Sequence, residues 1–291
     1  MARKRPTLIH YLEAIGAVII YFFFRALPVD WASGLGGFAA RMIGPRLGIT
    51  KRARENLRIA LPALDDAESR RILRDMWDNL GRVCAEYPHL RNFTIANGRI
   101  IVEDQGNILP ARDPKQRHIF FSAHCGNWEV TVRAAIQLGF EVTAVYRAAN
   151  NPVVDRLIAW ARGAEGGEFV PKGSAAAHRV FPALREGREL CMLIDQKMND
   201  GIAVPFFGRP VMTAPALALL AQRLNCAVVP AHVVRLKGAR FRVILEPPID
   251  LPKNDGAADR LQLMTTVNQI VERWIRERPE QWLWLHRRWP D

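Results

Sequence analysis

After about residue 100, short apolar runs alternate with segments of helical periodicity, and this alternation constrains the fold more than any other feature of the sequence. The runs of strand length lie at 119–123, 142–146, 169–170, 190–194 and 227–234. Segments of helix length separate them, at 130–138, 153–161, 175–184 and 214–224. Strands and helices that take turns along a chain form a largely parallel sheet covered by helices. The sequence therefore predicts an α/β domain over residues 101–291.

Additional elements are expected on both sides of this pattern. A strand at 241–245 follows the Lys237-Gly238 turn, and an amphipathic helix is expected at 261–275. Residues 50–91 have helical periodicity, with Pro62 separating two helices and Pro88 ending the second. We therefore predict a helical, membrane-facing extension over residues 31–100. With 49% hydrophobic residues in 291, the chain can form a full core, which excludes disorder.

The first 30 residues contain the strongest apolar run. Residues 14–24 have no polar side chain except that of Tyr21, and the run extends back to Leu8 if His10 and Glu13 are tolerated. Because a full membrane span needs roughly 17–25 apolar residues, the run is borderline. No small-x-small cleavage site follows it, which argues against a secretory signal. We predict a membrane anchor over residues 1–30, with a buried core helix and a signal peptide as the alternatives.

The charge is concentrated beside this apolar run. The net charge is +12, and residues 1–60 contain ten Lys or Arg against three Asp or Glu, a net +7. Nucleic acid, an anionic membrane surface and an acidic protein all attract such a segment. The adjacent apolar run and the lack of a nucleic-acid reader motif favour the membrane and argue against nucleic acid.

The distribution of basic residues also bears on topology. Arg3, Lys4 and Arg5 favour a cytoplasmic N-terminus, and a simple span would then place the α/β domain outside the cytoplasm. The basic residues of 41–58 favour a cytoplasmic location for the following segment. We therefore expect residues 8–27 to lie in the membrane plane, to re-enter, or to span with the N-terminus outside.

Most signatures of cofactor and metal chemistry are lacking. The four cysteines form no CxxC pair, and HExxH, GxxxxGK[ST] and GxSxG do not occur. A GxGxxA pattern at 34–39 has no preceding strand. The sequence thus predicts no metal and no cofactor, and the scattered cysteines suit a reducing compartment.

The sharpest local feature is the segment 120–129, Phe-Phe-Ser-Ala-His-Cys-Gly-Asn-Trp-Glu. An apolar strand enters a Gly-Asn turn, so His124 is expected at the carboxyl end of a strand, where open α/β sheets bind ligands. If a helix starts near Gly126, Glu129 can reach the imidazole, fix its tautomer and leave one ring nitrogen free as a general base. A structural N-terminal cap would explain the same pair of residues.

This segment resembles the HX4D/E motif of bacterial glycerolipid and lipid A acyltransferases. The form Ala-His-x-Gly-Asn-Trp-Glu is particularly similar to the lipid A biosynthesis acyltransferase family, which includes lauroyl, myristoyl and mannoside acyltransferases. The similarity extends over nearly the whole chain, through Tyr146-Arg147 with Asn151-Pro152-x-x-Asp155-Arg156, Pro171-Lys172-Gly173, Asp195-Gln196, Val204-Pro205-Phe206-Phe207-Gly208 with Thr213, and the segment Pro279 to Trp289.

The resemblance implies a fold like that of glycerolipid acyltransferases and an enzyme at the cytoplasmic face of the inner membrane. It implies acyl transfer from the thioester of acyl carrier protein to a hydroxyl of a lipid A precursor, an anionic glycolipid. His124 would be the general base, oriented by Glu129. Backbone N–H groups around Gly126 and Asn127, or a nearby arginine, would stabilise the oxyanion. Coenzyme A as donor, another lysolipid or glycolipid as acceptor, and a non-catalytic anionic-lipid-binding protein are the alternatives.

Three further residues are candidates for supporting the reaction. Arg147 and Arg162 could bind phosphates of an acidic glycolipid, since arginine suits bidentate phosphate recognition. In the family an arginine near Arg162 and an aspartate at the position of Asp195 are implicated in activity. Solvated helix-face arginines, and a turn or cap aspartate, are the alternative interpretations.

Two apolar segments have open roles. Residues 204–210 could form a wall for the acyl chain or the acceptor, or could simply pack. Trp282, Trp284 and Trp289 could lie at the level of lipid headgroups, or in a core-facing strand.

Overall fold

Strand β2 (His118–Ser122) lies at the centre of a seven-stranded sheet with the order β1-β9-β8-β2-β5-β3-β4. The computed structural model describes residues 6–110, 116–163, 167–252 and 256–289. The other six strands are β1 (Ile100–Asp104), β3 (Val142–Tyr146), β4 (Gly167–Pro171), β5 (Glu189–Leu193), β8 (Ala227–Arg235) and β9 (Phe241–Leu245). Strands β8, β2, β5, β3 and β4 are parallel, β9 is antiparallel to β8, and β1 is parallel to β9. The predicted α/β fold with a largely parallel sheet is confirmed.

Helices cover both faces of the sheet because the central strand is apolar on both sides. Ile119 and Phe121 of β2 pack into one core, with side chains of α7 (Ser174–Arg185), α8 (Ala216–Leu224) and α9 (Ala257–Glu277). Phe120, which points the opposite way, packs into a second core with Val130 of α5 (Glu129–Gln137). A strand buried on both faces is typical of parallel sheets.

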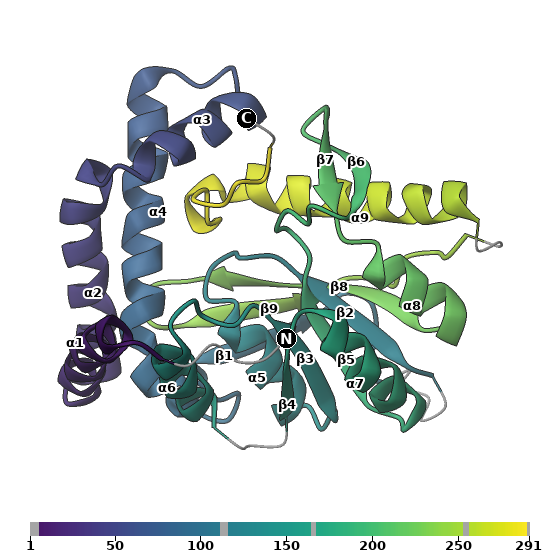
Figure 1. Cartoon of the computed structure of the whole chain (residues 1–291), viewed down its shortest axis with the longest axis horizontal. Coiled ribbons are helices and arrows are strands. Elements are labelled where there is room, and N and C mark those ends of the chain that lie inside the picture. The colour runs from purple at the N-terminus through teal and green to yellow at the C-terminus, as the bar shows by residue number, and fades with distance from the viewer. Residues whose placement is uncertain (1–5, 111–115, 164–166, 253–255, 290–291) are drawn as a thin grey trace.

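The residues before β1 form helices that stand beside the sheet (Figure 1). They are α1 (Leu8–Arg25), α2 (Val29–Ile43), α3 (Thr50–Ala60) and α4 (Asp66–Glu86), with short 3-10 helices at Gly44–Arg46 and Tyr87–Asn92. Helices α3 and α4 confirm the predicted break at Pro62, and Pro88 lies just after α4. Helix α2 packs closely on α4 because Gly36 and Gly81 face each other: a Cβ at Gly36 would lie 2.6 Å from the Gly81 carbonyl oxygen.

A small antiparallel hairpin, β6 (Ile202–Phe206) and β7 (Arg209–Thr213), packs beside α9. Val204 and Phe206 are fully buried, and the Phe206 ring stacks on Trp289 with centroids 5.5 Å apart. Of the two interpretations of residues 204–210, packing therefore describes these side chains. The prolines that favour a loop are tolerated because Pro205 and Pro210 face each other in a two-stranded ribbon with free edges.

The tryptophans near the end of the sequence belong to the core. Trp282 and Trp284 are fully buried and Trp289 is 4% exposed. An isolated bridge pairs Trp282 with Cys125, next to His124. These tryptophans thus face the core, although their segment forms an isolated bridge rather than the expected strand, and the interpretation as a headgroup-level surface is wrong.

Among the described residues, α1 is the helix long and apolar enough to cross a membrane, with a mean hydropathy of 1.5. It lies against α6 (Pro152–Arg162) and the segment Tyr87–Asn92. Asn151 Nδ2 donates to Glu13 at 2.9 Å, and Tyr21 packs on Trp160 with ring centroids 5.5 Å apart. The Tyr21 side chain thus packs against α6. The basic residues 3–5 lie outside the described part of the chain.

Candidate active site

The register of two neighbouring strands brings His124 and Asp195 together. Ser122 at the end of β2 lies opposite Leu193 at the end of β5, and the two strands are parallel. His124 and Asp195 each follow two residues beyond this pair, so both lie at the same carboxyl edge of the sheet. This is the edge at which the sequence predicted the site.

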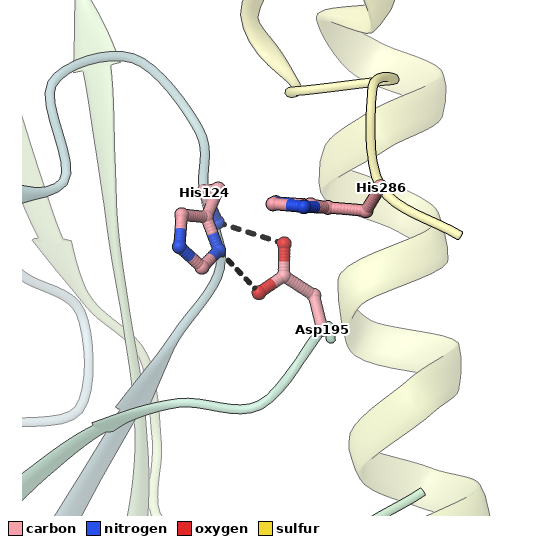
Figure 2. A group of neighbouring side chains, drawn as sticks. All are labelled: His124, Asp195 and His286. Carbon is pink, nitrogen blue, oxygen red and sulfur yellow. Dashed lines mark hydrogen bonds and ion pairs between the residues drawn. The ribbon is translucent and has the colours of Figure 1, made fainter. Parts of the chain in front are cut away.

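The Asp195 carboxylate binds His124 at two points (Figure 2). Asp195 Oδ1 lies 2.8 Å from His124 Nδ1, and Oδ2 accepts from the backbone N–H of His124 at 2.9 Å and from Trp282 Nε1 at 2.8 Å. Burial alone would raise the Asp195 pKa, but the interactions with His124, including two hydrogen bonds, outweigh it and hold that pKa far below its usual value. An ionised carboxylate only accepts, so His124 Nδ1 carries hydrogen, and in the neutral imidazole Nε2 then has the lone pair.

The prediction that Glu129 orients His124 is wrong in its geometry, because Asp195 occupies Nδ1. Glu129 Oε1 instead accepts from Tyr87 Oη at 2.7 Å and from Arg162 Nη2 at 2.8 Å, and Oε2 accepts from Arg162 Nε at 2.9 Å. Helix α5 begins at Glu129 itself rather than near Gly126. Burial raises the Glu129 pKa, but Arg162 and Tyr87 outweigh it and lower that pKa.

Arg162 is held inside the protein, so neither a solvated position nor an open phosphate site describes it. Its guanidinium forms the ion pair with Glu129 and lies over the rings of Tyr146 and Phe169, at 4.7 and 5.0 Å from the centroids. The side chain is 10% exposed. Burial lowers the Arg162 pKa, but the Glu129 charge outweighs this effect and raises it. The guanidinium therefore stays charged.

The Gly-Asn turn is held by a buried polar network, which engages one of the expected oxyanion donors. The Gly126 N–H already donates to the Gln281 carbonyl at 2.9 Å. Asn127 is fully buried and its Nδ2 donates to Glu86 Oε2 at 2.8 Å, while Arg235 pairs with the same carboxylate. The Gly126 N–H is thus engaged, and the Asn127 side chain supports the turn rather than facing a substrate.

The comparisons with known proteins identify the family of the chain. The profile of the bacterial lipid A biosynthesis acyltransferase family matches residues 2–291, nearly the entire chain. The chain belongs to this family. It is an acyltransferase of lipid A biosynthesis, which sets aside the alternative of a non-catalytic lipid-binding protein.

Curated relatives of this acyltransferase differ in the acyl group that their names specify. Over 268 residues it is 26% identical to the lipid A biosynthesis lauroyltransferase of Escherichia coli K12, covering 88% of this chain and 82% of the relative. It is also 26% identical to the myristoyltransferase of that strain over 86% of this chain and 77% of the relative, and 24% identical to its palmitoleoyltransferase over 84% and 83%. Among solved structures, the 1-acyl-sn-glycerophosphate acyltransferase PlsC from Thermotoga maritima aligns over 91% of this chain and 98% of that chain, with 14% identity and a TM-score of 0.38.

Arg147 and Lys172 form a basic rim on the site of the acyltransferase. Each follows its strand at the same edge, Arg147 after β3 and Lys172 after β4, and these strands are neighbours. Both side chains are exposed. Burial, and then the nearby Arg147 charge, lower the Lys172 pKa. Such a rim is suited to phosphate groups.

Sequence reasoning missed two residues of the acyltransferase site, Gln196 and His286. Gln196 Nε2 lies 3.3 Å from His124 Nε2 and 3.4 Å from His286 Nε2, and the two imidazole rings are 4.8 Å apart. Gln196 adjoins Asp195 in the sequence, which was a usable signal. His286 stands in a segment that looked like a headgroup-level surface, so its place could only come from the fold.

Three residues of the site also offer ligand atoms for a cation. Atoms of His124, Asp195 and His286 lie within 4.8 Å of one another, which is close enough for one ion to bridge. The Asp195 oxygens, however, already accept three hydrogen bonds, two from His124 and one from Trp282. This pattern is that of a carboxylate fixing an imidazole for proton transfer.

Proposed function

We propose that this protein transfers a fatty acyl group from the thioester of acyl carrier protein to a hydroxyl of a lipid A precursor, with His124 as general base. The observation that carries the proposal is the 2.8 Å contact between His124 Nδ1 and Asp195, which leaves Nε2 with a lone pair. The His124 side chain is 12% exposed, so a substrate can approach a base that is otherwise shielded from water. Family membership supports the acceptor class.

The proposed step follows from the weak acidity of an alcohol. As the hydroxyl oxygen bonds to the thioester carbon, its proton passes to His124 Nε2, and the buried Asp195 charge stabilises the imidazolium that forms. The tetrahedral intermediate then re-forms its C=O bond and breaks the C–S bond. The departing sulfur takes the proton back, which restores neutral His124.

Glu129 has an indirect role in this proposal. The ion pair with Arg162 and the Tyr87 hydrogen bond fix the first residue of α5. The preceding Trp128 packs on the His124 ring with centroids 5.1 Å apart. Glu129 would therefore position the base through Trp128, and Arg147 would meet a phosphate of the acceptor.

The test is acyl transfer by the purified protein, with acyl carrier protein thioester and a lipid A precursor as substrates. His124→Ala is expected to lower kcat by about 10²–10⁴-fold, the usual range for a lost general base. His178→Ala, which removes an exposed histidine on α7, is the matched control and should keep wild-type activity. If His124→Ala retains more than about a tenth of wild-type kcat, the mechanism is wrong; activity with the coenzyme A thioester alone would reassign the donor.

We also propose that the protein lies on the cytoplasmic face of the inner membrane, with α1 in the membrane plane. Contacts at Glu13, Tyr21 and Phe24 tie α1 along the side of the domain. Helix α2 exposes a second apolar stripe at helical spacing, formed by Trp31, Leu35, Phe38 and Met42. Such a stripe beside basic residues is typical of a helix in the membrane interface.

The membrane proposal predicts that the double change Trp31→Glu and Phe38→Glu releases a large share of the protein from membranes, measured by ultracentrifugation at physiological salt. Trp31 is 74% and Phe38 62% exposed, so folding should be little affected. Ile101→Glu, at an exposed apolar position on β1, is the control and should sediment with membranes to the same extent as the wild type. Unchanged sedimentation of the double variant would contradict the role of α2, and labelling of Arg54→Cys from the periplasmic side would contradict the orientation.

A further inference from the structure

We propose that Gln196 stabilises the tetrahedral oxyanion of the acyl transfer, and that His286 is the positioning residue that holds the Gln196 amide in place. This inference rests on the proposed function, because it presumes that His124 is the base. It starts from a convergence of three polar groups: the Nε2 atoms of His124 and His286 both face Gln196 Nε2, at 3.3 and 3.4 Å.

The protonation pattern of the cluster determines which end of the amide faces the base. Asp195 is an ionised acceptor, so a neutral His124, the form that acts as a base, carries its hydrogen on Nδ1 and presents a lone pair at Nε2. Only the NH2 end of the Gln196 amide can donate to that lone pair. The second hydrogen of the same NH2 group then points at His286 Nε2, which must also present a lone pair.

The surroundings of His286 keep its imidazole neutral, as this pattern requires. Burial, together with the neighbouring His124, Arg147 and Lys172, lowers the His286 pKa to about 4, and Asp195 opposes this effect. A neutral ring can present a lone pair at Nε2 and so accept from the Gln196 NH2 group. A protonated ring could present an N–H at Nε2, and that N–H would repel the NH2 group of Gln196.

Two backbone donors of the turn, at Cys125 and Gly126, are already engaged. The Cys125 N–H donates to the Ala123 carbonyl at 2.7 Å, and the Gly126 N–H donates to Gln281 at 2.9 Å. Arg162 donates to Glu129 through Nε and Nη2, and its Nη1, which has no hydrogen-bond partner, is fully buried. The Gln196 NH2 group, in contrast, lies directly at His124 Nε2, the nitrogen that takes the proton in the proposed reaction.

Substrate binding would free this donor at the right moment. The attacking hydroxyl must hydrogen-bond to His124 Nε2, and it thereby displaces the Gln196 N–H from that atom. As the C–O bond forms, the π electrons of the thioester carbonyl move onto the carbonyl oxygen. This oxygen is bonded to the carbon under attack. The freed N–H can donate to this oxyanion while the hydrogen bond to His286 keeps the amide in place.

The experiment compares variants at the two positions under steady-state conditions with both substrates. Gln196→Ala is expected to lower kcat by about 10²–10³-fold, the usual cost of losing one oxyanion donor, with KM values changed only a few-fold. Gln105→Ala, at an exposed glutamine beside β1, is the matched control and should match the wild type.

His286 is tested by rescue and by a double-mutant cycle. His286→Phe keeps a ring but lacks the acceptor and should lower kcat at least tenfold, whereas His286→Gln places an acceptor oxygen near the Nε2 position and should recover most of it. Because His286 acts through Gln196, the double variant Gln196→Ala with His286→Phe should be no slower than Gln196→Ala alone. Thermal unfolding of each variant checks that the fold is kept.

Each outcome bears on one proposal or on both. Gln196→Ala with more than a third of wild-type kcat, or fully additive losses in the double variant, would overturn the roles of Gln196 and His286 while an inactive His124→Ala leaves the base in place. An active His124→Ala variant would contradict both the role of His124 as general base and the roles of Gln196 and His286.

Discussion

Replacement of Asp195 by asparagine is expected to lower kcat by about 10³–10⁴-fold while the protein stays folded. Asn can still accept from Trp282 and from the His124 backbone, but its NH2 group then faces His124 Nδ1. That atom would have to become an acceptor, so the ring hydrogen would move to Nε2 and the lone pair needed for proton abstraction would be lost. Loss of the negative charge also removes stabilisation of the imidazolium.

A second buried pair between a histidine and a carboxylate provides the control for Asp195. His118 Nδ1 lies 3.3 Å from Glu189 Oε1 at the beginning of β2 and β5, away from the carboxyl edge where Asp195 lies. Glu189→Gln should lower stability without a comparable loss of kcat. Measurement of kcat and of thermal unfolding for both variants separates the two effects, and an Asp195→Asn protein above a tenth of wild-type kcat would refute the assignment.

Replacement of Arg162 by methionine is expected to lower the free energy of unfolding by about 3–5 kcal/mol, because Glu129 is then left as a buried charge without its partner. Glu129 is 6% and Arg162 10% exposed, so water cannot replace the lost contacts. The double variant Glu129→Gln with Arg162→Met should recover a large part of the loss, since it removes both charges. Denaturation with urea measures each difference.

The surface ion pair between Arg179 and Glu168 offers the matching control. Its side chains are 56% and 28% exposed, and pairs of this kind contribute about 0–1 kcal/mol. Arg179→Met should therefore change stability little. A loss in Arg162→Met as small as that in the control would mean that the Glu129 pair does not stabilise the fold.

Short-range patterns in the sequence predicted the strands well. The apolar run 142–146 coincides with β3 and 241–245 with β9. Buried strands are recognisable as short apolar runs between turn residues, and both signals lie within a few neighbouring residues. The hairpin of β6 and β7 was missed because its two prolines are typical of loops, and β1 was missed because only its first residue, Ile100, is fully buried.

The candidate site was predicted only in part, for a physical reason. The position of His124 depends on the end of one strand, which is a local property. The partner of its ring depends on the register between β2 and β5, which joins residues 71 apart in the sequence. Glu129, five residues away, was the obvious local partner, but the start of α5 and the opposing charge of Arg162 direct its carboxylate elsewhere.

The position of Trp282 and His286 inside the site has a consequence for the order in which the protein matures on the ribosome. Synthesis proceeds from the N-terminus, so α1 and α2 emerge first and can reach a membrane while the sheet is still being made. The Asp195 carboxylate lacks the Trp282 hydrogen bond, and Gln196 lacks its acceptor, until residues 282–286 have been synthesised. Attachment to the membrane would therefore precede catalytic competence, and an incompletely synthesised chain would be anchored but inactive.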